Sequence, residues 1–263
     1  MRVPGSDLYY EDDGEGLPIL LIHAGGATAS TWGRAVDDLA EVGRVIKYDR
    51  RGYQRTGGDP VGSIATHAAD AAGLLDALRT PPVVAVGISV SATIALDLAL
   101  RRPDLVRAVV AHESPWRVRR QPPTIPQLAA FSRMGWRVAR GRHAEAVAAF
   151  LRFAYSYRDG GSAWDAFPED WRRTAEENAH AALADFRIAV GGHPSAKELA
   201  TMTRPVLCTY GARSNKPLVR VARTLARVIP TAQVSEIEGA AHAAAFDAPT
   251  NFVQVIADAA RLG

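Results

Sequence analysis

The stretch VVAVGISVSA, residues 83–92, decides the fold that we expect for this chain. Its first four residues are apolar, which is typical of a strand buried on both faces of a sheet. The spacing then becomes helical over residues 89–101, so Ser89 falls at the turn between strand and helix. Such a turn is sharp and lifts the serine hydroxyl above the edge of the sheet. Its flanking positions must be small, and Gly87 and Ser91 meet that requirement.

Ser89 is therefore a candidate nucleophile. The helix that follows it directs its first N–H groups, and the positive end of its dipole, at a negative oxygen forming beside the serine. The other interpretation of this position is a serine that only caps the helix. Further catalytic groups elsewhere in the chain favour the first interpretation.

Short apolar runs alternate with helical spacing along most of the chain. We expect strands at residues 8–11, 18–23, 44–48, 83–86, 106–111, 206–210 and 234–237, and helices at residues 32–42, 63–78, 89–101, 217–228 and from 247 onward. Fully apolar strands separated by helices indicate an α/β fold. The sequence thus predicts a doubly wound, mostly parallel sheet covered by helices on both faces.

Residues 114–202 interrupt this alternation. They show helical spacing over residues 126–140, 143–157 and 171–190 but no convincing strand. We interpret residues 1–113 and 203–263 as one α/β core and residues 114–202 as an inserted helical cap. A cap of this kind would cover the ends of the strands, where active sites of α/β sheets are built.

The composition is that of an ordinary globular protein, with 48% apolar residues, 22% charged residues and a net charge of +3. A single cysteine, Cys208, excludes an internal disulfide, and its apolar neighbours indicate a buried side chain rather than a catalytic thiol. The seven histidines lack the paired spacing of metal ligands. We therefore expect neither a metal nor another cofactor.

Targeting and partner signals are weak. No run of about 18 apolar residues occurs, and residues 1–16 lack the features of a secretory signal, so we expect a cytoplasmic protein without a membrane partner.

Arg117, Arg119 and Arg120 could belong to a nucleic-acid-binding arm. No aromatic or basic stripe accompanies them, so we favour a solvated hinge and expect no nucleic-acid partner. A homo-oligomer is left open.

A glycine-rich loop follows the strand expected at residues 18–23. It reads His23-Ala24-Gly25-Gly26, and its backbone can approach a ligand closely because glycine has no side chain. We expect the Gly25 amide and the Val90 amide to bind an oxyanion together. An ordinary tight turn is the alternative interpretation. His23 is expected to make structural hydrogen bonds under this loop rather than to act as the base.

A second histidine lies past the last expected strand, in the stretch EGAAHA of residues 238–243. From such a loop His242 can reach a serine on the central strand, accept its proton and later return it to a leaving group. A solvated loop histidine is the alternative. The small neighbouring residues and the order along the chain favour a general base.

These motifs together resemble the α/β-hydrolase superfamily, specifically its esterase, lactonase and haloperoxidase-like members. The resemblance runs through residues 23–26, 49–52, 87–91 and 239–242 and spans nearly the whole chain apart from the cap. It implies that Asp49-Arg50-Arg51-Gly52 is the family's structural turn, without a chemical role. The sequence departs from the family pattern at Ser91 and at Gln54, where glycine is more usual.

The acid of the catalytic triad is a further departure. The family usually places an aspartate three residues after a glycine that ends the penultimate strand, and Ser214 occupies that position here. A second location in the superfamily, after the strand that follows the nucleophile helix, offers Glu113. This choice preserves the order serine, acid, histidine. A purely structural Glu113 is the alternative, and His112 beside it is expected to be structural.

The resemblance implies a serine hydrolase that cleaves a small apolar ester or lactone through an acyl-enzyme, with a triad of Ser89, His242 and Glu113. Dehalogenases and epoxide hydrolases of this superfamily use a carboxylate nucleophile, which is replaced here by serine. A carbon–carbon bond hydrolase, a thioesterase or a perhydrolase could use the same triad. A non-catalytic ligand-binding protein or a cyclase of the same fold is the remaining alternative.

Overall fold

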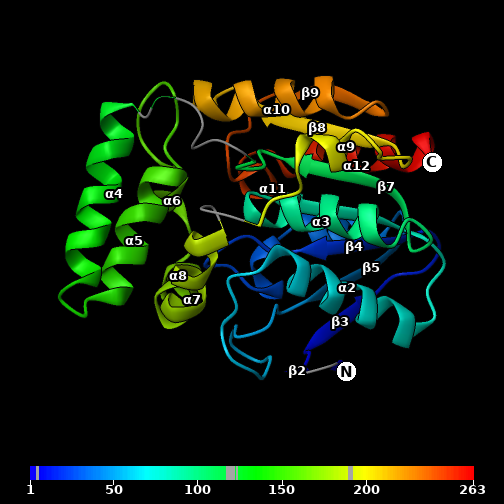
Figure 1. The fold of residues 1–263 in the computed structure, drawn as a ribbon, viewed down its shortest axis with the longest axis horizontal. Helices are drawn as coiled ribbons and strands as arrows, with labels where there is room; N and C mark the ends of the chain where they lie inside the picture. Colours follow the sequence, from blue (N-terminus) through cyan, green and yellow to red (C-terminus); the bar gives the residue numbers. More distant parts are fainter. Residues whose placement is uncertain (4–5, 117–121, 123, 189–191) are drawn as a thin grey trace.

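A seven-stranded sheet forms the centre of the described part of the molecule (Figure 1). The computed structural model describes residues 1–3, 6–116, 122, 124–188 and 192–263. The strand order is β3-β5-β4-β6-β7-β8-β9, in which β3 pairs antiparallel with β5 and the other neighbours pair in parallel. The strands are β3 (Tyr10–Asp13), β4 (Pro18–Ile22), β5 (Arg44–Tyr48), β6 (Val83–Ile88), β7 (Val106–His112), β8 (Val206–Gly211) and β9 (Ala232–Ile237).

The predicted mostly parallel α/β sheet is confirmed. Each expected strand is present with shifts of up to two residues at its ends, and β3 is displaced by two residues at both ends. The antiparallel pair of β1 (Arg2–Val3) and β2 (Ser6–Asp7) is not predicted by the sequence, because strands of two residues carry no periodic signal.

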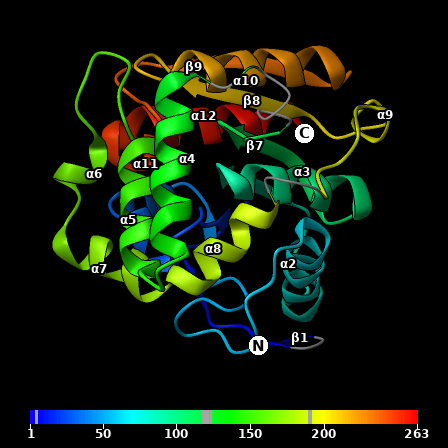
Figure 2. The ribbon, with the colours of Figure 1, turned by 60° about the vertical axis from the view of Figure 1, so that its left-hand side comes forward.

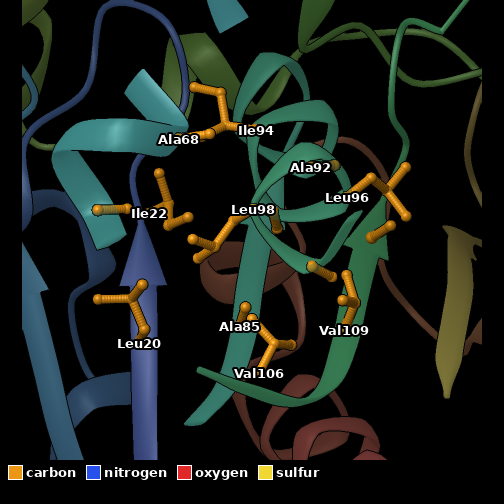
Figure 3. Close-up of a cluster of buried hydrophobic side chains, with 14 of the residues drawn as sticks. Leu20, Ile22, Ala68, Ala85, Ala92, Ile94, Leu96, Leu98, Val106 and Val109 are labelled. Atoms are coloured by element: carbon orange, nitrogen blue, oxygen red, sulfur yellow. The ribbon is translucent and has the colours of Figure 1, made fainter. Parts of the chain in front are cut away.

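Helices cover the sheet on both faces, and strand residues alternate between two apolar clusters. Leu20 and Ile22 of β4 belong to one cluster, together with residues of α2 (Ile64–Leu78), α3 (Val90–Arg101) and α10 (Lys216–Val228); Figure 3 shows part of it. Ile19 and Leu21 belong to the other cluster. That cluster also contains residues of α1 (Ala35–Ala40) and α12 (Pro249–Leu262). This period of two follows from the pleat of a strand and explains why β4 and β6, buried on both faces, carry no polar side chain.

The remaining core elements are short. A 3-10 helix η1 (Ala29–Trp32) precedes α1, so the single helix expected over residues 32–42 is replaced by these two pieces. The closing helix is likewise preceded by α11 (Ala244–Asp247). Among the described helices, none is both long enough and apolar enough to span a bilayer.

Residues 114–202, here called the helical insertion, leave the sheet after β7 and return at β8. Their described part contains α4 (Ile125–Val138), α5 (His143–Ala154), α6 (Ala163–Ala166), α7 (Glu169–Glu177), α8 (Ala179–Ile188) and α9 (Ala196–Leu199). Helices α4 to α8 gather at one end of the molecule (Figures 1 and 2). Residues of α5 to α8 share an apolar cluster that also includes Ala243 of the core. The two ends of the insertion, at Trp116 and Leu199, pack into the main core instead.

One helix expected in the insertion is divided. The spacing over residues 171–190 predicts a single helix, whereas α7 ends before Asn178 and α8 starts after it. The Asn178 side chain donates to the carbonyl of Thr174 (2.7 Å) and accepts from the amide of Gln54 in the core (2.8 Å). Asn178, at the break between the two helices, thus links the insertion to the core through its hydrogen bond with Gln54. Residues 189–190 and the three arginines at 117, 119 and 120 lie outside the described residues.

Candidate active site

Ser89 occupies a strained position between β6 and α3. Its backbone angles are φ 60° and ψ −128°, an uncommon conformation for a residue with a side chain. Gly87 is required here, because a Cβ on it would lie 2.3 Å from the carbonyl oxygen of Ser91. The Ser89 side chain makes no capping hydrogen bond to the helix, which argues against a capping serine.

Ser91 does more than fill a small space. Its Oγ accepts a hydrogen bond from the Ile88 amide (2.9 Å) and donates one to the Ile88 carbonyl (2.8 Å). The hydroxyl thereby closes the turn around Ser89, a contribution that glycine at this position could not make.

The expected oxyanion donors lie at the ends of two neighbouring strands. Val90 is the first residue of α3, where amides have no partner within the helix. Gly25 follows β4, and a Cβ on it would lie 3.9 Å from Cγ1 of Val90 and 3.2 Å from Oδ2 of Asp185. The structure therefore brings Gly25 and Val90 together, at the N-terminus of a helix that favours negative charge.

His242 is paired with a buried carboxylate. Its Nδ1 lies 2.7 Å from Oε2 of Glu113, which is fully buried directly after β7. This is the contact that a Ser-His-Glu triad requires. Because Nδ1 donates to Glu113, a neutral imidazole presents Nε2 as its acceptor nitrogen.

The other oxygen of Glu113 is also occupied. The Ser214 hydroxyl and the Gly211 amide (3.2 Å) both donate to Oε1. Ser214 holds the position where the family usually has its acid, and here it donates a hydrogen bond to Glu113, the candidate acid. Sequence reasoning left Ser214 without a role, although its position relative to Gly211 was the available signal.

These contacts determine the charge of Glu113. Burial raises the pKa of the carboxyl, but the hydrogen bonds from His242 and Ser214 outweigh burial, and the pKa of Glu113 falls to about 2. Glu113 is therefore ionised at neutral pH. An ionised acid is the form that can stabilise an imidazolium on His242.

His112 holds the loop that carries His242. Its Nε2 lies 3.0 Å from the Ala241 carbonyl, and its Nδ1 lies 3.0 Å from Oγ1 of Thr209. Burial lowers the pKa of His112, so the ring is neutral. We infer that Nε2 donates to Ala241 and Nδ1 accepts from the threonine hydroxyl. Asp247 braces the same loop, since its Oδ2 accepts from the Ala241 amide (2.9 Å).

Two cavities adjoin the site. One, with an empty volume of about 590 Å³, is lined by Ser89, Gly25, Val90, Asp185 and His242, among others. The other, of about 570 Å³, has walls rich in aromatic side chains from the core and the insertion: Trp32, Tyr155, Trp164, Phe167, Trp171 and Phe246. His242 lines both cavities. Two mostly apolar spaces thus adjoin the candidate base.

The candidate groups are not all in contact. Ser89 and His242 line the same cavity, but within the described part of the chain no hydrogen bond joins the hydroxyl to the imidazole. Catalytic hydrogen bonds of this kind are often long in unliganded enzymes and tighten when substrate binds.

His23 is not one of the candidate catalytic groups. Its Nδ1 is 2.9 Å from the Ala24 carbonyl and its Nε2 accepts from the Arg50 amide (2.9 Å).

Comparison with known proteins bears on the family of this chain. A model of the alpha/beta hydrolase family matches residues 19–255. The uncharacterized hydrolase YraK of Bacillus subtilis strain 168 is 35% identical over 116 residues, and the putative carbamate hydrolase RutD of Azorhizobium caulinodans is 39% identical over 106 residues. These alignments cover 43% and 40% of both chains, so the chain spans less than half the length of these curated relatives.

Solved structures resemble the chain over nearly its full length. An enol-lactonase from Burkholderia xenovorans LB400 superposes with a TM-score of 0.79 and 20% identity over 97% of each chain. A thermophilic esterase from Thermogutta terrifontis gives a TM-score of 0.78 and 24% identity over 97% of this chain and 93% of its own. Identities this low show the shared fold. Together with the family match over most of its length, they establish that this chain belongs to the alpha/beta hydrolase family.

Proposed function

We propose that this protein is a serine hydrolase that cleaves a small apolar carboxylic ester or lactone through an acyl-enzyme. The observation that carries the proposal is the 2.7 Å contact between His242 and the buried, ionised Glu113, on the wall of the cavity that contains Ser89. A protein that only binds a ligand has no need of a buried carboxylate that orients an imidazole beside a strained serine.

In the proposed reaction, Ser89 Oγ attacks the substrate carbonyl carbon while His242 Nε2 takes the hydroxyl proton. The carbonyl electron pair moves to oxygen, and the amides of Gly25 and Val90 stabilise the resulting oxyanion. The oxyanion then re-forms the carbonyl, the bond to the alcohol oxygen breaks, and His242 returns its proton to that oxygen. Water repeats the sequence to release the acid. Every step uses groups of the protein or water.

Glu113 and its partners orient the base. With both oxygens hydrogen-bonded, the carboxylate fixes the His242 tautomer that leaves Nε2 available and stabilises the imidazolium that forms. Ser214 and Gly211 hold Oε1, so that Oε2 remains aimed at His242.

The cavities suggest the substrate class. Their walls are mostly apolar, and the solved structures that share this fold include an enol-lactonase and an esterase. Both observations favour an apolar ester or lactone. We propose that the helical insertion acts as the cap, because its residues Leu151, Tyr155 and Phe167 face core residues across these spaces. The cap would then exclude water and shape the apolar part of the site.

A fluorophosphonate probe tests the proposal. The probe should form one covalent adduct on the peptide that contains Ser89, detected by mass spectrometry. Ser89→Ala should not be labelled, whereas Ser132→Ala, which changes an exposed serine on α4, should be labelled like the wild type. Equal labelling of Ser89→Ala would contradict the proposal.

A further inference from the structure

A second buried polar network lies beside the catalytic groups and joins the insertion to the core. The Arg50 guanidinium is fully buried, and its Nη1 and Nη2 donate to the two carboxylate oxygens of Asp185 at 3.1 and 2.6 Å. Asp185 belongs to α8, and only 5% of its side chain is exposed. Bidentate geometry and burial make this a strongly oriented ion pair.

The same arginine holds the loop that contains Gly25. Its Nε donates to the His23 carbonyl (3.1 Å), its backbone amide donates to His23 Nε2 (2.9 Å), and its Nη2 donates to the Ala24 carbonyl (3.4 Å). Burial and the charge of Arg50 lower the pKa of His23, which therefore stays neutral and accepts this amide. Three of the loop's hydrogen bonds thus depend on where Arg50 lies.

Tyr53 makes a parallel connection. Its hydroxyl donates to Oδ2 of Asp185 (2.6 Å) and accepts from the Gly26 amide (3.2 Å). The oxygen of Asp185 that receives this bond also lies 3.2 Å from the position of a Cβ on Gly25. Asp185 consequently lies close to Gly25 and hydrogen-bonds to both side chains that hold the loop, Arg50 and Tyr53.

His67 completes the surroundings of the ion pair. Its Nε2 lies 3.2 Å from Nη1 of Arg50 and 3.8 Å from Oδ1 of Asp185. Burial and the charge of Arg50 lower the pKa of His67 to about 4, so it is neutral at physiological pH. The network therefore contains one cation and one anion, and removing either leaves the other unpaired.

We propose that Asp185 is a positioning residue for the oxyanion hole. Through Arg50 and Tyr53 it fixes residues 23–26, and it aims the Gly25 amide correctly only when the helical insertion is docked on the core. The oxyanion hole is thus complete for a substrate carbonyl only when the insertion is docked on the core. This inference rests on the proposed function, since it assigns a support to one of the two proposed donors.

Asp185→Asn and Tyr53→Phe test the inference, with hydrolysis of an aryl ester and inhibition by benzeneboronic acid as readouts. The boronic acid forms a tetrahedral anion on the serine, so its affinity reports on the oxyanion hole. We expect Asp185→Asn to lower kcat about 10- to 100-fold, with KM changed little and boronic acid affinity falling in parallel. Tyr53→Phe, which keeps the ion pair and the ring, should show a smaller loss of the same kind.

Asp159→Asn is the matched control. Asp159 also belongs to the insertion and pairs with a core arginine, Arg213 (3.2 Å), but this pair does not touch residues 23–26. The control should keep the wild-type kcat and boronic acid affinity. The inference is overturned if Asp185→Asn and Tyr53→Phe keep both quantities and change only KM or Tm, because Asp185 then only docks the insertion. Activity that survives in Ser89→Ala would instead overturn the proposed function.

Discussion

Glu113 uses its two carboxylate oxygens for different purposes. Oε2 receives the His242 ring, while Oε1 receives Ser214 and Gly211. Glu113→Gln keeps the shape but replaces one acceptor by a donor, so His242 loses its preferred tautomer. We expect a fall in turnover of about 10³–10⁴ with the fold retained, measured by ester hydrolysis and circular dichroism.

Ser214→Ala provides the comparison for that variant. It removes one donor to Oε1 and leaves the Gly211 amide in place, so turnover should fall about 10-fold or less. If Glu113→Gln lost no more activity than Ser214→Ala, Glu113 would not be the triad acid.

The lowered pKa of Glu113 predicts how stability depends on pH. A carboxyl with a pKa of about 2 in the folded protein, below its ordinary 4.5, binds a proton more readily in the unfolded chain. Its contribution is therefore present above about pH 4.5 and is lost as pH falls toward about 2. Urea unfolding of wild type and Glu113→Gln should give free energies whose difference shrinks over this range. A difference that stays constant would contradict the assigned ionisation.

At the scale of elements, two glycines allow the catalytic groups to approach one another. Gly87 lets the start of α3 fold back on β6, and Gly211 lets the end of β8 approach the loop before His242. A Cβ on Gly211 would lie 2.2 Å from the Ala240 carbonyl oxygen. Both close approaches involve backbone atoms, which cannot move aside as a side chain could.

Gly87→Ala should therefore destabilise the protein by about 1–3 kcal/mol and displace Ser89, so that activity is lost as well. Gly135→Ala is the matched control, since a Cβ there meets nothing within 4 Å on α4. That control should leave activity unchanged and raise stability by about 0.5–1 kcal/mol, because alanine favours a helix over glycine. Unfolding free energies and ester hydrolysis check both variants, and full activity in Gly87→Ala would contradict the proposed turn geometry.

The elements themselves were largely predictable from the sequence. Strands buried on both faces are continuous apolar runs, and the turn at Ser89 carries its own local signal. The break at Asn178 was missed because its cause is a hydrogen bond to Gln54, a residue far away in the chain. Local periodicity contains no information about such a contact.

The same limit applies within the site. Ser89, His242 and the glycine-rich loop of residues 23–26 follow from local motifs, and the family resemblance implies Glu113, because Ser214 occupies the usual acid position. Asp185 carries no signal in the sequence, because it is one of several acidic residues in a helical segment and its proposed role depends on contacts with Arg50 and Tyr53. The hydrogen bond from Ser214 to Glu113 likewise joins residues that follow different strands, β8 and β7.

At the scale of the whole molecule, side chains of the insertion and of the core together line the aromatic-rich cavity of about 570 Å³. Phe167 of the insertion is central, with ring centroids 5.0 Å from Tyr155 and 4.9 Å from Phe246 of the core. Phe167→Leu should enlarge this space and shift the ratio of kcat/KM for longer over shorter acyl chains by about 10-fold. Trp136→Ala, an exposed change on α4, should leave that ratio unchanged. An unaltered chain-length profile in Phe167→Leu would mean that the acyl group lies elsewhere.

Trapping the acyl-enzyme is the most direct test of the central claim that Ser89 is acylated with His242 as base. Protein mixed with an activated aryl ester and quenched in acid should carry one acyl group, located by mass spectrometry on the peptide that contains Ser89. Ser89→Ala should show no adduct and should lose essentially all hydrolysis while keeping its fold. An adduct on another residue, or more than a few per cent of activity in pure Ser89→Ala, would contradict the account.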